Sequence, residues 1–336
     1  MSPDALLPLL KSTFGFDAFR GRQADVVARV MAGAHTLAVM PTGAGKSLTY
    51  QLPAVALDGC VVVVSPLIAL MHDQLRGARA AGIRAASLTS VDADFADTRQ
   101  AYRDGQLDLL YIAPERATGE GFRSLMAARP PALFAIDEAH CVSEWGHDFR
   151  PDYRLLRPLL DAFPAVPRLA LTATADKHTR EDILVQLGIP AEGLILAGFD
   201  RPNIRYRIAP RGAPAKQLTE FIAANPSPGI VYCPTRDGTE RMAAKLAAAT
   251  GRSVAAYHAG LDPERRARVQ HDFVASEDGI VTATVAFGMG IDKPDVRFVA
   301  HAGLPKSIES YYQETGRAGR DGDPAEALML WGAEDF

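Results

Sequence analysis

The chain has 336 residues, of which 48% are hydrophobic, so it can bury a substantial core, and its length suggests two domains. The net charge of −4 and the sequence pI of about 6.1 give no compositional sign of a nucleic-acid partner, so any groove for DNA or RNA must be a local arrangement of charge. The three cysteines lie far apart in the sequence, which excludes a cysteine-rich zinc site and favours a reducing, cytosolic setting.

The N-terminus shows no targeting segment. Residues 1–14 (MSPDALLPLLKSTF) lack the basic region followed by an apolar core that a signal peptide needs. No apolar run approaches the length of a membrane span, which is about 18–20 residues. We therefore expect a soluble cytoplasmic protein with no membrane partner.

The first part of the chain alternates short apolar runs with helical stretches. Five runs rich in β-branched or apolar residues are expected to form strands: 35–40 (HTLAVM), 60–67 (CVVVVSPL), 107–114 (LDLLYIAP), 132–138 (ALFAIDE) and 168–174 (RLALTAT). Apolar strands without alternation, separated by helices, are typical of a buried parallel sheet in a doubly wound α/β domain.

A second series of such runs follows a segment rich in Pro and Arg, residues 200–216. It comprises 228–234 (PGIVYCP), 253–260 (SVAAYHAG), 278–287 (DGIVTATVAF), 296–303 (VRFVAHAG) and 326–331 (EALMLW). The break around 200–210 indicates a linker between two domains of similar α/β architecture. We place these domains at residues 1–203 and 204–336.

Residues 40–50 (MPTGAGKSLTY) lie where a predicted strand ends and a helix begins, which is where backbone N–H groups and a helix N-terminus can bind phosphate. Lys46 is expected to reach the β- and γ-phosphates, and Ser47 to supply a Mg²⁺ ligand. The general pattern G-x-x-x-x-G-K-[ST] has glycine where this chain has Met40. The residues expected to surround the phosphates are Thr42, Gly43, Ala44, Gly45, Lys46 and Ser47.

Two adjacent acids, Asp137 and Glu138, close the apolar run at 132–136. An acid at the carboxyl end of a parallel strand faces the same crevice as the phosphate loop. Asp137 can hold Mg²⁺ directly or through water, and Glu138 can orient and deprotonate an attacking water.

Arg317 and Arg320 lie in residues 307–322 (SIESYYQETGRAGRDG), with glycines beside them. They are three positions apart, so on one turn they could share a face. A positioned arginine can be worth about 10³–10⁵ in the rate of phosphoryl transfer, or roughly 4–7 kcal/mol. A solvated helix face is the alternative reading.

Several of these segments together resemble a known family. In order and spacing, 40–47 (MPTGAGKS), 64–74 (VSPLIALMHDQ), 111–116 (YIAPER), 137–140 (DEAH), 171–175 (LTATA), 285–301 (VAFGMGIDKPDVRFVAH) and 313–322 (QETGRAGRDG) match the motifs of superfamily 2 helicases, and specifically those of RecQ-family DNA helicases. The resemblance covers nearly the whole chain. It implies two tandem RecA-like domains of the P-loop NTPase kind, with ATP in the cleft between them, that drive 3′-to-5′ movement along single-stranded DNA.

The resemblance also assigns nucleotide contacts. Residues 14–23 (FGFDAFRGRQ) look like the family's adenine-recognition motif, in which Gln23 would hydrogen-bond the adenine edge while Arg20 and the Phe16 ring sandwich its faces. Without the resemblance, the phenylalanines of this segment would be taken as core residues. Asp292 would reach the ribose.

The same resemblance assigns roles in the second domain. Arg320 would be the arginine finger that meets the γ-phosphate, and Arg317 a second phosphate or sensing contact. Gln313 would link the ATP and DNA sites.

Residues 143–153 (SEWGHDFRPDY) look like the aromatic-rich loop of RecQ enzymes. Trp145 and Phe149 can stack on unpaired bases, a contact worth about 1–3 kcal/mol per base. His147 and Arg150 can bind the DNA backbone or relay its presence to the acids a few residues upstream. Buried packing is the alternative for Trp145. Weaker candidates for backbone contacts are Ser65, Pro66, Thr172, Thr174, Thr235, Arg236 and His258.

The expected function is therefore that of an ATP- and Mg²⁺-dependent DNA helicase acting on single-stranded and partial-duplex DNA. The resemblance implies a role in repair and recombination, in association with a bacterial nucleoid. The chain ends where many relatives continue into zinc-binding and winged-helix modules, so we expect a catalytic fragment with no zinc. An RNA helicase, or a nucleic-acid-binding scaffold with weak ATPase activity, remains an alternative.

Overall fold

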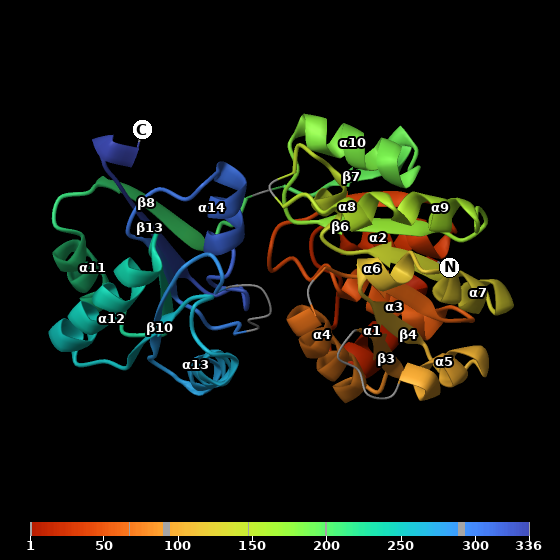
Figure 1. Cartoon of the computed structure of the whole chain (residues 1–336), viewed down its shortest axis with the longest axis horizontal. Helices are drawn as coiled ribbons and strands as arrows, with labels where there is room; N and C mark the ends of the chain where they lie inside the picture. The colour runs from red at the N-terminus through yellow and green to blue at the C-terminus, as the bar shows by residue number, and fades with distance from the viewer. Residues whose placement is uncertain are drawn as a thin grey trace. The chain divides into compact units, whose positions relative to one another are not determined.

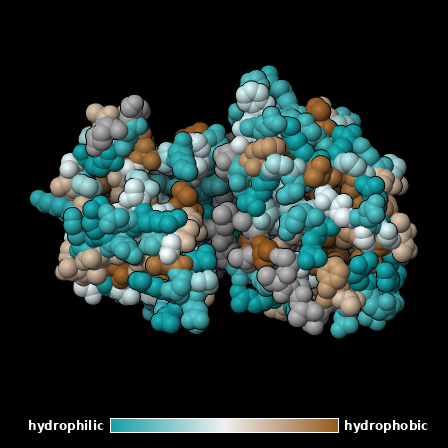
Figure 2. Space-filling model, in the orientation of Figure 1, coloured by the Kyte–Doolittle hydropathy of each residue, from teal (hydrophilic) through white to brown (hydrophobic). Residues whose placement is uncertain are grey.

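The computed structural model describes residues 2–66, 68–89, 95–146, 148–198, 200–287 and 293–335. The chain forms two compact units, Met1–Phe199 and Asp200–Phe336 (Figure 1). Hydrophilic side chains cover most of the visible face of each unit, with apolar side chains scattered among them (Figure 2). Among the described residues, no helix combines the length and the apolar character needed to cross a membrane.

The first unit is built on a seven-stranded sheet in the order β3-β4-β2-β5-β6-β1-β7, and all of the pairings between its described strands are parallel. Its strands are β1 (Thr36–Val39), β2 (Val61–Val64), β3 (Ala85–Leu88), β4 (Leu109–Ile112), β5 (Leu133–Ile136), β6 (Arg168–Thr172) and β7 (Leu194–Leu196). Because the strands are parallel, their carboxyl ends lie along one edge of the sheet, where ligands bind in open α/β folds.

Helices cover both faces of this sheet. The α-helices are α1 (Leu7–Phe14), α2 (Gln23–Met31), α3 (Leu48–Ala56), α4 (Ile68–Ala80), α5 (Phe95–Arg103), α6 (Pro114–Ala117), α7 (Glu120–Ala128), α8 (Pro151–Arg154), α9 (Leu156–Asp161) and α10 (Lys177–Leu187). Short 3₁₀ turns are η1 (Asp4–Leu6), η2 (Ala139–Val142) and η3 (Ala191–Gly193).

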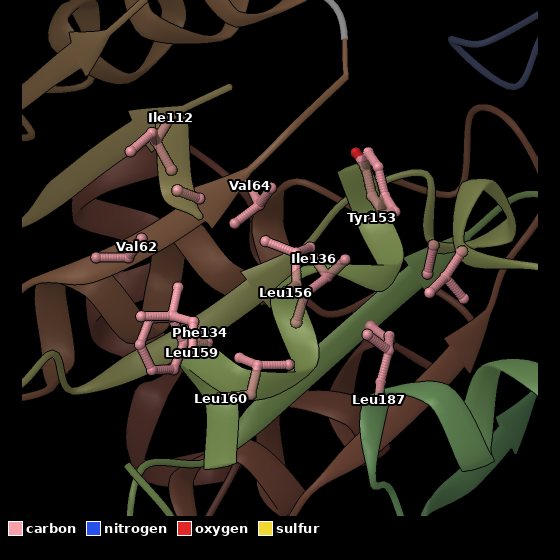
Figure 3. Packing of buried hydrophobic residues seen from close by; sticks show 14 of the residues in the cluster. Val62, Val64, Ile112, Phe134, Ile136, Tyr153, Leu156, Leu159, Leu160 and Leu187 are labelled. Atoms are coloured by element: carbon pink, nitrogen blue, oxygen red, sulfur yellow. The ribbon is translucent and has the colours of Figure 1, made fainter. Parts of the chain in front are cut away.

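The unbroken valine run of β2 shows why the strands lack alternation. Val62 and Val64 pack into one core cluster with residues of α7, α9 and α10, and Val61 and Val63 pack into a second cluster with residues of α2, α3 and α4. Successive side chains of a strand point to opposite faces, and both faces are covered, so every position must be apolar. Figure 3 shows the first of these clusters, with Val62 and Val64 among its labelled residues.

The second unit repeats this design with a six-stranded parallel sheet in the order β10-β11-β9-β12-β13-β8. Its strands are β8 (Ile204–Pro210), β9 (Gly229–Tyr232), β10 (Val254–Tyr257), β11 (Ile280–Ala283), β12 (Phe298–His301) and β13 (Ala325–Trp331). Its helices are α11 (Pro214–Ala223), α12 (Arg236–Thr250), α13 (Pro263–Ala275), α14 (Ile308–Thr315) and the 3₁₀ turn η4 (Ala333–Asp335). Core residues of α13 lie in one cluster, and those of α11 and α12 in another.

The α/β class and all ten strands expected from apolar runs are confirmed. The sequence missed β3, β7 and β8, and reading 200–210 as a plain linker was wrong, because Ile204–Pro210 pairs with β13 along its whole length. β8 is an edge strand with mostly exposed side chains, so it carries no apolar run.

Candidate active site

The predicted phosphate loop connects β1 to α3. Gly43 and Gly45 have φ values of 83° and 69°, in the left-handed region that glycine tolerates best. Lys46 Nζ donates to the carbonyl oxygens of Met40, at 3.2 Å, and Pro41, at 3.5 Å. The ammonium group is thus held over the loop, where phosphate oxygens would accept the same protons.

Gln23 braces this loop from α2. Its Nε2 donates to the carbonyls of Ala44, at 2.8 Å, and Gly45, at 3.2 Å, while its Oε1 accepts from the Arg20 backbone N–H at 2.9 Å. Gly45 is favoured by its positive φ, and a Cβ atom there would lie 2.5 Å from Gln23 Nε2 and would displace this amide. The predicted contact between Gln23 and adenine must therefore use the remaining lone pair of Oε1.

The two residues expected to sandwich adenine lie together and are accessible. Phe16 is 43% exposed, and the guanidinium carbon of Arg20 lies 5.8 Å from the centre of its ring. Phe14 and Phe19 instead pack against a core cluster formed by α1, α2 and α3. Taking all three phenylalanines as core would thus have been wrong for Phe16. Asp292, the expected ribose contact, lies outside the described residues.

Asp137 and Glu138 follow β5 at the carboxyl edge of the sheet. Asp137 is buried, and its pKa is raised to about 6, first by burial and then by the charge of Glu138, while the Lys46 ammonium and hydrogen bonds from the Glu138 backbone and from Gln74 oppose that rise. Lys46 lies close enough to lower the pKa of Asp137, so the acids and the phosphate loop belong to one site. Gln74, at the end of the motif 64–74, was not singled out by the sequence.

Glu138 has φ 48° and ψ 45°, the one left-handed non-glycine residue in the part of the chain that the structure describes. Such a conformation costs about 1–3 kcal/mol and persists only where surrounding contacts fix it. The backbone N–H of Glu138 donates to Asp137 Oδ1 at 3.0 Å. Glu138 Oε2 is buried without a hydrogen-bond partner, and it lies 3.4 Å from His140 Nδ1.

A hydrogen-bond chain fixes the tautomer of His140. The Thr172 hydroxyl donates its proton to the Thr174 carbonyl at 3.0 Å, so its oxygen must accept from His140 Nδ1, also at 3.0 Å. Nδ1 therefore carries the proton, and this N–H also faces the Glu138 carboxylate. The LTATA segment thus holds the ring beside the expected base rather than offering its buried hydroxyls to solvent.

These residues fit a divalent cation. The buried carboxylate of Asp137 beside the half-buried Glu138 needs a compensating positive charge, and the buried Oε2 atom of Glu138, which has no hydrogen bond, needs a partner. Hard oxygen ligands of this kind suit Mg²⁺. The hydroxyl of Ser47 and the carboxylate of Asp137 are the groups available to hold it.

The aromatic-rich loop projects Trp145 from the first unit. Trp145 is 76% exposed, which excludes buried packing as its role, and its backbone N–H donates to the Ser143 hydroxyl at 3.2 Å. A Cβ atom on Gly146 would lie 2.3 Å from the His140 carbonyl oxygen, so glycine lets the loop fold back against η2. Phe149 is half-buried, with the Arg154 guanidinium carbon 5.2 Å from its ring centre. His147 lies outside the described residues.

Arg150 ties the loop to a neighbouring motif. Its Nη1 donates to the Pro66 carbonyl at 2.9 Å, its Nη2 pairs with Asp148 at 3.0 Å, and its backbone N–H donates to the Cys141 carbonyl at 2.9 Å. A side chain engaged in this way is better placed to relay movement of the loop than to bind DNA phosphate directly.

Tyr153 provides a second tie that the sequence did not reveal. Its buried hydroxyl donates to the Asp137 backbone carbonyl at 2.9 Å, and burial raises the pKa of this tyrosine well above its ordinary value. The ring belongs to the first core cluster, with Ile136 and Leu156 labelled nearby in Figure 3. The end of the aromatic-rich loop is therefore attached to the backbone of the expected metal ligand.

In the second unit, α14 carries Gln313 and ends at Thr315, before the turn of residues 316–320, which we call the arginine turn. Its two arginines are half-buried and lie near Tyr232, whose pKa is raised to about 12 by burial, against the opposing influence of Arg317 and Arg320. The reading as a solvated helix face is therefore wrong. Beneath the turn, buried His301 Nε2 lies 2.6 Å from Glu314 Oε2.

The weaker candidates divide by exposure and by contacts. Ser65, Thr172 and Thr174 are buried. Thr235 caps α12, its hydroxyl accepting from the Gly238 N–H at 3.0 Å, and His258 Nε2 lies 3.2 Å from Glu240 Oε1. For these side chains a DNA contact stays a prediction.

Comparisons with known proteins agree with the motifs. Residues 20–183 match the DEAD/DEAH box helicase family, and residues 214–322 match the helicase conserved C-terminal domain. The chain is 48% identical over 335 residues to the ATP-dependent DNA helicase RecQ of Haemophilus influenzae, covering 98% of this chain and 54% of that protein. It is 40% identical to the probable ATP-dependent DNA helicase RecS of Bacillus subtilis, covering 96% of this chain and 66% of that protein. The chain thus spans about half to two thirds of these relatives.

Solved structures support the fold. Mycobacterium smegmatis helicase Lhr bound to ssDNA and AMP-PNP superposes with a TM-score of 0.71 at 22% identity, covering 98% of this chain and 48% of that one. Mss116p bound to ssRNA and AMP-PNP superposes with a TM-score of 0.77 at 16% identity, covering 99% of this chain and 75% of that one. These likenesses confirm the predicted fold of two tandem RecA-like domains. The family matches and the sequence relatives place the chain in the RecQ family of helicases, whose helicase core it carries.

Proposed function

We propose that this chain is the motor core of a DNA helicase that couples ATP hydrolysis to 3′-to-5′ movement along single-stranded DNA and to duplex unwinding. The observation that carries this most directly is the pair of ties from the aromatic-rich loop to the ATP site. Arg150 donates to the Pro66 carbonyl, and Tyr153 donates to the Asp137 carbonyl, while Trp145 of the same loop is exposed.

ATP would be bound by the phosphate loop of residues 42–47, with Lys46 on the β- and γ-phosphates and the accessible Phe16–Arg20 pair at the base. Bound Mg²⁺ would supply charge neutralisation of the phosphates. Ser47 and Asp137 are the residues that would hold it.

Hydrolysis needs an oriented water and a base. Glu138, held in a left-handed conformation with one carboxylate oxygen unpartnered, is suited to accept a proton from that water. The His140 N–H, fixed by Thr172, lies beside this carboxylate and helps to hold it in place. Arg320 would stabilise the charge that develops on the γ-phosphate oxygens, with Arg317 as a second phosphate or sensing contact.

DNA would act through the loop. Bases stacked on Trp145 would move the loop, and the two ties would pass that movement to the backbone of Asp137 and to Pro66, which follows the neighbouring strand β2. Residues 137–153 thus join an exposed aromatic to a buried reaction centre within 17 positions of sequence.

Single-stranded and partial-duplex DNA are the partners we propose, with work in repair and recombination at a bacterial nucleoid. The sequence relatives are named DNA helicases, whereas the fold is shared with a protein solved on ssRNA. RNA is therefore the alternative that an experiment must address.

The test is Mg²⁺-dependent ATP hydrolysis with no nucleic acid, with single-stranded DNA, and with single-stranded RNA of matched length. We expect strong stimulation by DNA alone, followed by unwinding of a 3′-tailed duplex. Equal or stronger stimulation by RNA would overturn the assignment of DNA as the substrate. The absence of hydrolysis in all three conditions would overturn the proposal that the chain is an ATP-driven motor.

A further inference from the structure

The segment that begins the second unit holds the arginine turn by its carbonyl groups. The guanidinium group of half-buried Arg201 reaches across more than a hundred residues of sequence to donate to this turn. Its acceptors are the backbone carbonyls of Gly316 at 3.1 Å, Ala318 at 2.8 Å and Gly319 at 3.0 Å.

Asn203 adds a second grip on the same turn. Its Nδ2 donates to the carbonyl of Gly319 at 2.9 Å and to that of Asp323 at 2.9 Å. Gly319 has φ 55°, and a Cβ atom there would lie 2.5 Å from Asn203 Nδ2. A Cβ atom would also lie 2.7 Å from the Asp323 backbone carbonyl oxygen, so both the left-handed backbone and this close approach favour glycine.

We infer that Arg201 and Asn203 are positioning residues for ATP hydrolysis, which fix the backbone of the arginine turn so that Arg317 and Arg320 present their guanidinium groups in one geometry. Neither Arg201 nor Asn203 is assigned a contact with nucleotide or DNA. The inference rests on the proposed function, because it gives a purpose to the position of Arg320.

The clamp is itself anchored in the sheet. The Asn203 carbonyl accepts from the Ala325 N–H at 2.8 Å, and the Arg201 carbonyl accepts from the Ile204 N–H at 2.8 Å. Ile204 and Ala325 are the first register pair of β8 and β13. Arg201 and Asn203 therefore stand at the start of a paired strand, and through their side chains the arginine turn is fixed to the sheet.

An arginine suits this task better than a lysine would. Its planar fork presents N–H donors on three separate nitrogens in a fixed geometry, whereas a lysine ammonium carries all of its donors on one nitrogen at the end of a flexible stem. The two terminal nitrogens of this fork together meet three carbonyls spread over four residues.

The location of the clamp also has a consequence for control. Arg201 follows directly on Asp200, the first residue of the unit, so the segment that joins the two units covalently is the one that holds the arginine turn. A change in the backbone conformation of this segment would shift Arg201 and, with it, the carbonyls of the arginine turn to which it donates.

The test is a double-mutant cycle between Arg201→Ala and Arg320→Ala in the 336-residue chain, with kcat and KM for ATP measured at saturating single-stranded DNA. Arg201→Ala should lower kcat by about 10- to 100-fold, because misplacing a catalytic group by about 1 Å can cost about 10²-fold. KM for ATP should stay within about twofold, since the interaction is made in the transition state. In the Arg320→Ala background, the loss of kcat caused by Arg201→Ala should be clearly smaller, because the effect exerted through Arg320 is already gone and only that exerted through Arg317 remains.

Two variants keep the test specific. Arg205→Ala removes an exposed arginine of β8 and should leave kcat and KM unchanged. Arg201→Lys keeps the charge but not the fork, and should recover only part of the lost kcat.

An Arg201→Ala rate near that of the unaltered chain, or an equal loss in both backgrounds, would overturn the positioning role while leaving the proposed function intact. Full activity of Arg320→Ala would overturn the role of Arg320 and this inference with it, whereas no DNA-dependent hydrolysis by the unaltered chain would overturn the proposed function itself.

Discussion

The hydroxyl of Tyr153 donates a hydrogen bond to the backbone carbonyl of Asp137 at 2.9 Å. The tyrosine stands at the end of the aromatic-rich loop, and the aspartate is the expected Mg²⁺ ligand. A buried bond between these two positions means that the loop and the reaction centre cannot shift independently without leaving a carbonyl unsatisfied, at a cost of about 1–3 kcal/mol.

Tyr153→Phe should separate stimulation by DNA from basal hydrolysis. The variant keeps the ring that packs in the core and loses only the bond to Asp137. We expect the DNA-stimulated rate to fall by up to about tenfold, since a hydrogen bond contributes about 0.5–1.5 kcal/mol. The basal rate should stay within about twofold, which a steady-state ATPase assay with and without single-stranded DNA measures.

Tyr102→Phe is the matched control. Tyr102 is also buried in the first unit, and its hydroxyl donates to the Arg129 carbonyl at 2.8 Å, away from the acids. Both variants should lower the melting temperature, and only Tyr153→Phe should lose stimulation. Loss of stimulation in both would point to general loosening of the unit.

Asp137 should make the folded state less stable as the pH rises. Its folded pKa of about 6 lies above the usual aspartate value of about 4. Between these two pH values the unfolded chain has released this proton and the folded chain still holds it, so the free energy of unfolding falls as the pH rises through this range. Asp137→Asn removes that cost. In EDTA, the variant should melt above the unaltered chain at pH 7, by about 1–3 kcal/mol in the free energy of unfolding, and the difference should vanish below about pH 4.

Asp176→Ala should show the opposite dependence of stability on pH. Asp176 caps α10, and hydrogen bonds from Thr179 lower its pKa, so its contribution is present above the ordinary aspartate pKa and is lost as the pH falls through the folded value. This variant should melt below the unaltered chain at pH 7 and approach it in acid. A melting difference for Asp137→Asn that did not change with pH would contradict the burial of its charge.

Thr172→Val should slow hydrolysis without weakening ATP binding. Valine keeps the shape but cannot accept from His140 Nδ1, so the ring loses the contact that fixes its proton beside Glu138. We expect kcat to fall by about tenfold with KM for ATP unchanged, the pattern of a contact that matters in the transition state. Thr282→Val, a buried threonine of β11 that donates to the Thr239 carbonyl at 3.0 Å, should leave kcat unchanged.

Gln23→Ala tests adenine recognition against loop bracing. The Nε2 group of Gln23 is engaged with the phosphate loop, and one lone pair of Oε1 remains to accept from the adenine amino group. Guanine presents an acceptor at the same position, so the amide should discriminate against GTP. We expect kcat/KM to fall more for ATP than for GTP. An equal fall for both nucleotides would leave Gln23 with the bracing role alone.

The sequence predicted what depends on local pattern. The valines of β2 must all be apolar because both faces of the sheet are covered, and the glycines of the phosphate loop must tolerate positive φ. Such requirements restrict the residue types at neighbouring positions of the sequence, so they can be recognised there. The edge strand β8 escaped detection because its side chains face solvent and only its backbone pairs.

Contacts between a side chain and a distant carbonyl could not be read in this way. Tyr153 bonding to Asp137, and Arg201 bonding to the arginine turn, depend on how elements pack, and a backbone carbonyl accepts from any donor. Neither pair leaves a periodic or spacing signal. The motifs located the site, and the structure supplied the links between its parts.

The central claim is that DNA on the exposed loop is reported to the acids, and Trp145→Ala tests it most directly. ATP hydrolysis by this variant and by the unaltered chain should be measured with and without single-stranded DNA. Because Trp145 is 76% exposed, the variant should fold and melt normally, keep its basal rate, and lose stimulation by DNA. An equal loss of the basal and the stimulated rate, or stimulation that survives the substitution, would contradict the account.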